Sequence, residues 1–141
     1  MDFMSVFDIS AAGMNFERMR LEVSASNLAN AQTTAGAGGA YRPLRAIASA
    51  SVPDSFDMRL ASALPRPLDV TIVPSNAAPR LVLDPGHPDA DARGFVAYPD
   101  VNPVSEMVRL VEISRAYEGN VRALSMARAM ALKALEIGSE R

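Results

Sequence analysis

The stretch that decides the fold is residues 103–137, which read PVSEMVRLVEISRAYEGNVRALSMARAMALKALEI. Apolar side chains return there after alternately three and four residues, the repeat of a helix that packs along a partner helix. The positions of this stripe are Met107, Leu110, Ser114, Tyr117, Val121, Leu124, Arg128, Ala131 and Leu135. At 1.5 Å per residue the helix is about 50 Å long. A chain of 15.0 kDa cannot cover such a helix, so part of the stripe is expected to pack on another molecule.

The ends of this helix are marked by residues with defined preferences. Pro103 suits a first helical position, Asn102 is the predicted N-cap, and Glu106 complements the helix N-terminus. Gly138 is predicted to stop the helix after Ile137.

A second amphipathic helix is predicted from Met4 or Ser5 to Ala31. Its stripe consists of positions seven apart and of the residues three further on, namely Ile9, Phe16, Val23 and Asn30 with Ala12, Met19 and Ser26. Asn30 is expected to end the helix, because Asn tolerates the left-handed conformation found at helix C-termini. The two helices can pair with each other in either direction.

The middle of the chain has a different pattern. Gln32 to Gly39 holds three glycines and predicts a loop. Most of the ten prolines follow, and they favour short strands joined by turns. The predicted strands are residues 45–52, 68–73, 80–84 and 94–98. The sequence therefore predicts an α+β protein in which long N- and C-terminal helices form a coiled coil, with a small loop-rich β unit between them. The predicted divisions are residues 1–31, 32–102 and 103–141.

Composition excludes several classes of protein. A net charge of −2 over 141 residues gives no basic footprint for nucleic acid. No apolar run approaches the eighteen or so residues of a membrane-spanning helix. Residues 1–9 carry Asp2 and Asp8 without a basic region or cleavage site, so no cleaved secretory signal is expected. Cysteine is absent, which excludes disulfides and thiolate metal sites.

One cluster has the composition of a metal site. His87 lies within four residues of Asp84, Asp89 and Asp91, and imidazole and carboxylates bind divalent ions. Asp-Pro-Gly and His-Pro are also turn formers, and the turn interpretation is favoured. His87 is the only histidine, and no serine lies in a Gly-x-Ser-x-Gly elbow. We therefore predict no enzyme activity, no catalytic residue, no cofactor and no bound metal.

Three separated motifs follow one another along the chain. The first is residues 24–31, SASNLANA, followed by Thr33 and Thr34. The second combines residues 85–91, PGHPDAD, with 94–96, GFV, and 98–102, YPDVN. The third is residues 106–108, EMV, with 114–120, SRAYEGN. Together they resemble the motifs of the axial flagellar proteins, the rod and hook group, and the second is similar to a run typical of a proximal-rod member of the group. Residues 43–80 contribute nothing to the resemblance, and Phe95 and Asp100 replace an expected Tyr and Asn.

The resemblance implies a structural subunit of the proximal rod, the hollow drive shaft of the flagellar basal body. Its expected partners are other copies of itself, other rod proteins and the flagellar type III export apparatus. Its expected location is the basal body in the periplasmic space, reached without a cleaved signal peptide. The expected assembly interface consists of Ile9, Phe16, Met19, Val23, Asn27, Asn30, Met107, Leu110, Tyr117, Val121, Leu124, Arg128 and Leu135. The alternative left open is a small soluble coiled-coil adaptor or metal-assisted binding module.

Overall fold

The structure is a computed structural model that describes residues 3–34, 39–49 and 69–139, with side chains described from Val6 to Ile137. The described elements, in chain order, are α1 (Phe3–Ala29), β1 (Leu44–Ser49), β2 (Asp69–Pro74), β3 (Arg80–Leu83), β4 (Phe95–Tyr98) and α3 (Pro103–Ser139). The chain is thus an α+β protein with a helix at each end. The parts of the predicted glycine-rich loop and of the first two predicted strands at residues 35–38, 50–52 and 68 lie outside the described residues.

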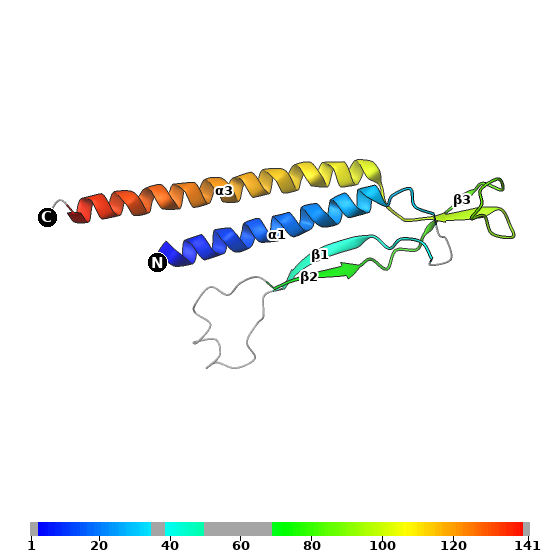
Figure 1. The fold of residues 1–141 in the computed structure, drawn as a ribbon, viewed down its shortest axis with the longest axis horizontal. Coiled ribbons are helices and arrows are strands. Elements are labelled where there is room, and N and C mark those ends of the chain that lie inside the picture. The colour runs from blue at the N-terminus through cyan, green and yellow to red at the C-terminus, as the bar shows by residue number, and fades with distance from the viewer. Residues whose placement is uncertain (1–2, 35–38, 50–68, 140–141) are drawn as a thin grey trace, which may run out of the picture.

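The two helices lie side by side and run in opposite directions, so that the N- and C-terminal ends of the chain are at the same end of the molecule (Figure 1). With 37 residues against 27, α3 is the longer helix and extends past the start of α1 in the same view. The last turns of α3 therefore have no helix from the described residues beside them.

The four strands form two separate two-stranded antiparallel sheets. β1 pairs with β2 from Leu44 opposite Pro74 to Ser49 opposite Asp69, and this hairpin lies along α1 (Figure 1). β3 pairs with β4 from Arg80 opposite Tyr98 to Leu83 opposite Phe95, and this hairpin projects beyond the helices. All four predicted strands are confirmed over the described residues.

The helix ends lie within about two residues of the predicted positions. Two of the physical reasons given for where the helices stop were wrong. The Asn102 side chain accepts hydrogen bonds from the amides of Val104 (3.0 Å) and Ser105 (3.3 Å), which confirms the N-cap of α3. Asn30 follows the end of α1, but no non-glycine residue in the described part of the chain has a positive φ. Its side chain instead donates to the Ser26 carbonyl (2.8 Å). The stop at Gly138 was also wrong, because α3 continues through it to Ser139.

The core is small for a chain of this length. The buried apolar residues of the described part are Val23, Ala31, Val96, Ile113 and Ala127. Exposed large apolar residues are far more numerous, and most of them lie on α3. Since soluble monomers rarely leave extensive apolar patches in water, this distribution makes the surface of α3 the candidate site.

Candidate assembly surface

The seam between α1 and α3 is lined by polar and small residues. On α1 the buried positions Ser10, Glu17 and Ser24 fall seven apart, and Ser24 donates a hydrogen bond to the buried carboxylate of Glu106 on α3 (2.8 Å). Further along, a Cβ at Gly13 would lie 3.0 Å from the Asn120 side chain, so the helices approach closely there. Within the helix pair the buried Ser24 and Glu106 are thus hydrogen-bonded to each other and Glu17 is paired with Arg20, while many large apolar side chains of α3 remain exposed.

The predicted stripe of α1 does not form this seam. Ile9 is 58% exposed, whereas Phe16, Met19 and Asn30 are half-buried. Val23 and Asn27 are the buried members of that predicted set, and both line a pocket shared with β1. One residue's step around a helix is 100°, so the buried positions Ser10, Glu17 and Ser24 lie on a neighbouring face rather than on the predicted one.

The predicted stripe of α3 coincides with the seam at alternate positions. Leu110, Leu124 and Ala131 are half-buried, as expected. At the intervening positions the buried residues are Glu106, Ile113 and Ala127, each one residue before the predicted Met107, Ser114 and Arg128. The remaining predicted positions, Tyr117, Val121 and Leu135, are exposed by 42%, 42% and 70%. The buried positions of α3 thus have the predicted seven-residue repeat, but part of the predicted stripe faces away from α1.

Exposed apolar side chains in the first turns of α3 form a second surface, turned away from α1. Val104, Met107, Val108 and Val111 are each more than half exposed. Their spacing of three, four and seven residues places them on one face of the helix. We call these four residues the outer stripe. They are exposed whereas Glu106 and Ile113 of the same turns are buried, so the outer stripe has no cover from the described part of this chain.

A further exposed apolar group lies at the far end of α3. It consists of Met126, Met130, Leu132, Leu135 and Ile137. The end of α3 that carries the last of these residues extends past the start of α1 (Figure 1). Together with the outer stripe it provides apolar surface along most of the helix.

Asn27 joins α1 to β1 through both the nitrogen and the oxygen of its side-chain amide. Its Nδ2 donates to the Leu44 carbonyl (2.9 Å), and its Oδ1 accepts from the Leu44 amide (2.8 Å) and from the Tyr41 hydroxyl (3.0 Å). The amide therefore pairs with Leu44 as a neighbouring strand would. Sequence reasoning placed Asn27 in an interface between subunits and missed this role within the chain. An Asn followed by a loop and a strand does not by itself indicate which backbone it binds.

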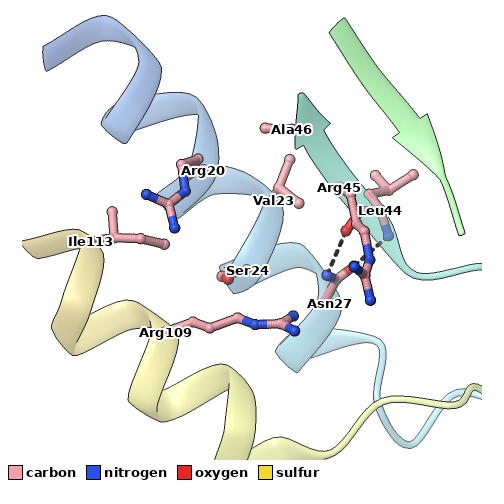
Figure 2. A pocket seen from close by; sticks show the side chains of 9 residues that line it. All are labelled: Arg20, Val23, Ser24, Asn27, Leu44, Arg45, Ala46, Arg109 and Ile113. Carbon is pink, nitrogen blue, oxygen red and sulfur yellow. Dashed lines mark hydrogen bonds between the residues drawn. The ribbon is translucent and has the colours of Figure 1, made fainter. Parts of the chain in front are cut away.

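A pocket of about 230 Å³ lies beside Asn27, between α1, β1 and α3. Figure 2 shows its lining, with Arg20 from α1, Arg45 from β1 and Arg109 from α3. Arg20 is paired with Glu17 (2.8 Å) and Arg109 with Glu106 (2.5 Å), each three residues back on its own helix. Sequence reasoning missed this pocket, because its arginines are distant in sequence.

The predicted turn around His87 is confirmed, and one of its acidic residues, Asp91, binds the backbone. The Asp91 carboxylate accepts hydrogen bonds from the amides of Phe95 (2.9 Å) and Arg93 (2.8 Å), and these bonds hold the pKa of Asp91 below its ordinary value of 3.8. Asp89 accepts a hydrogen bond from Thr34, and the His87 ring nitrogen Nδ1 accepts one from the Asp89 amide (3.1 Å). Within the described residues no group of three or more His, Asp or Glu side chains is arranged to hold a metal ion.

Comparison with known proteins gives the class of this chain first. Residues 92–137 match the family described as "Flagellar basal body rod FlgEFG protein C-terminal". Among the described helices, none combines the length and hydropathy needed to cross a membrane. The class is therefore that of the flagellar rod proteins.

Full-length relatives narrow this class. The chain is 36% identical over 138 residues to the flagellar basal-body rod protein FlgC of Salmonella typhimurium, covering 98% of this chain and 99% of that protein. It is 37% identical over 142 residues to FlgC of Bacillus subtilis (93% and 95% covered) and 35% identical over 144 residues to FlgC of Yersinia enterocolitica (98% and 99% covered). The chain belongs to the FlgC family of flagellar basal-body rod proteins. It is a structural subunit of the basal-body rod, and its relatives are structural proteins.

Proposed function

We propose that this chain is a subunit of the proximal rod and that it assembles through its terminal helices into the hollow shaft that transmits torque and conducts exported subunits. Its partners are other copies of itself and other rod proteins. It reaches the periplasmic space through the flagellar type III export apparatus without losing a cleaved leader. Membership of the FlgC family supports the proposal.

One observation carries the assembly part of the proposal. The helix pair buries Ser10, Glu17, Ser24 and Glu106 while the outer stripe remains in water. Fully burying one such Val or Met side chain is worth roughly 1.5–3 kcal/mol. A monomer that leaves these groups exposed forgoes that stabilisation, which a neighbouring subunit can provide. A contact that does not close on itself repeats indefinitely and builds an open helical array.

Within the rod, the terminal helices pack as a coiled coil, which is the arrangement expected of sequences with a seven-residue repeat. Within the seam Ser24 and Glu106 already pair with each other, and the exposed apolar groups of the outer stripe and of the far end of α3 remain to pack on helices of adjoining subunits. The interface we propose thus includes the exposed members of the predicted set, chiefly Ile9, Met107, Tyr117, Val121 and Leu135.

Deletion and complementation test this function. Cells that lack the chain should form no rod, hook or filament and should not swim, and the full-length gene should restore all three. The chain extracted from purified basal bodies should have the mass of the uncleaved sequence, about 15.0 kDa. Complete rods in the deletion strain, or basal bodies that do not contain the chain, would refute the proposal.

A further inference from the structure

The pocket between α1, β1 and α3 contains unused hydrogen-bond donors. A guanidinium has five N–H donors. Arg20 uses its Nη1 for both oxygens of Glu17, and Arg109 uses its Nη1 for Glu106. Arg45 makes no hydrogen bond or ion pair with the described part of the chain. Most of the donors carried by the three arginines therefore have no partner in the part of the chain that the structure describes.

The pocket also has an excess of positive charge. Arg20, Arg45 and Arg109 carry three positive charges, and the carboxylates paired with them, Glu17 and Glu106, carry two negative ones. The nearby polar groups of Asn27 and Ser24 are already hydrogen-bonded within the chain. The site therefore carries a net charge of +1, which favours the binding of one anionic group.

The shape and lining of the pocket favour a small planar anion. Val23 and Ile113 are buried and form apolar walls, which limit the water available to the guanidinium groups. A cavity of about 230 Å³ has room for several waters, and so for one acidic side chain. Guanidinium forks match the two oxygens of a carboxylate and can bind both at once.

We propose that this pocket, which we call the arginine pocket, binds a carboxylate group, and that an Asp or Glu side chain of an adjoining rod subunit supplies it. The inference rests on the proposed function, because it requires a neighbour. A free carboxylate would gain little from a pocket open to water, since exposed ion pairs contribute little to binding. A side chain held there by subunit packing displaces the remaining water, and the attraction then acts in a lower dielectric.

The position of the pocket gives a partner access to it. The side chains of Arg20 and Arg109 are 35% and 45% exposed, and Arg45 is exposed on β1. The three guanidinium groups therefore reach solvent on the side of the molecule that carries the pocket, which is a different side of α3 from the outer stripe. An ion pair there would fix the axial position of a neighbour packed on that side, which apolar packing alone specifies poorly.

A competition experiment tests the proposal. Arg45→Glu and wild-type chains are co-expressed, and their ratio in purified basal bodies is compared with their ratio in whole cells. Charge reversal inside a desolvated ion pair should lower incorporation by about tenfold or more. Arg45→Lys should be incorporated at an intermediate level, because Lys keeps the charge but loses the fork. The matched control is Arg93→Glu, which makes the same change of charge at an exposed site in the turn between β3 and β4.

The source of the carboxylate is settled by imaging wild-type basal bodies at side-chain resolution. A carboxylate of an adjoining subunit within hydrogen-bond distance of the arginine pocket is expected. A pocket open to water or filled by a free anion such as acetate, or Arg45→Glu incorporated as well as Arg93→Glu, would overturn the inference. None of these three results would affect the proposed function, because the chain would still be present in the rod; that function fails if the rod lacks the chain or forms without it.

Discussion

The side chain of Asn27 fixes the position of β1 against α1 through three hydrogen bonds. Replacing Asn27 by Ala leaves both backbone groups of Leu44 without their partner. An unsatisfied buried polar group costs about 1–3 kcal/mol, so Asn27→Ala should lower the free energy of unfolding by about that amount. Chemical denaturation and hydrogen exchange of the Leu44 amide measure the effect.

Asn15→Ala is the matched control for Asn27→Ala, because Asn15 is exposed on the same helix and its one hydrogen bond, from Arg18, is long (3.4 Å). Its effect should stay within about 0.5 kcal/mol. Equal losses in the two variants would contradict the role given to Asn27.

Asp91 gives the turn between β3 and β4 a dependence on pH. The pKa of Asp91 lies below its ordinary value of 3.8 because the ionised carboxylate accepts the Phe95 and Arg93 amides. The stabilisation is therefore complete above the ordinary pKa and is lost as the pH falls through the lowered one. Protection of the Phe95 amide should decline in that acidic range in the wild type.

The variant Asp91→Ala should lack this protection at every pH, whereas Asp91→Asn, whose side chain still accepts a hydrogen bond, should retain part of it without the acid transition. An acid transition in Asp91→Asn would show that another group is responsible.

At the scale of the elements, the close approach of α1 and α3 depends on Gly13. A Cβ there would lie 3.0 Å from the amide of Asn120, which is the end of a flexible side chain and can move by a few tenths of an ångström. Gly13→Ala should therefore be tolerated, since Ala favours the helix by up to about 1 kcal/mol. Gly13→Leu cannot be accommodated and should lower the thermal midpoint by forcing the helices apart.

Gly119→Leu provides the comparison, because a Cβ at Gly119 on α3 would meet no other atom within 4 Å. The substitution should leave the stability of the isolated chain unchanged or raised. Should Gly13→Leu be as stable as Gly119→Leu, α1 and α3 would not pack as closely as described.

Both helices and all four strands could be predicted from the sequence, because helix stripes, caps and strand alternation are local patterns. The face of α3 that packs on α1 could be predicted only in part. Leu110 and Leu124 lie at the seam, but Met107 does not, and the buried residue beside it is the charged Glu106. A search for an apolar repeat selects a large apolar residue rather than the Glu beside it as the buried position. The hydrogen bond from Ser24 that allows Glu106 to be buried comes from 82 residues away.

The arginine pocket escaped prediction for a similar reason. Arg20, Arg45 and Arg109 lie on three elements, and their convergence follows from the pairing of Asn27 with Leu44 and the packing of α3 on α1. Local sequence patterns do not indicate that side chains from three distant elements lie close together. By contrast, the turn at His87 and Asp91 could be predicted, because its hydrogen bonds join residues no more than four positions apart.

At the scale of the whole molecule, the chain has a hydrogen-bonded seam inside and apolar surface outside, as expected for a part that is completed by its neighbours. The exposed groups of α3 extend from Val104 to Ile137, most of the length of the helix. An assembled rod that buries them gains stabilisation that the isolated subunit lacks. The central claim is therefore that the outer stripe is an assembly interface.

The measurement that tests this claim most directly is rod assembly by Val108→Asp. Val108 is 53% exposed, so the isolated variant should fold, as circular dichroism can check. Burying an unpaired carboxylate costs several kcal/mol, and each 1.4 kcal/mol weakens association about tenfold. Ser105→Asp is the control, because it adds the same charge at an exposed position in the first turn of α3, where the helix N-terminus favours it. We expect Val108→Asp to be produced and exported but to form no rods, while Ser105→Asp cells swim; normal rods built from Val108→Asp would contradict the account.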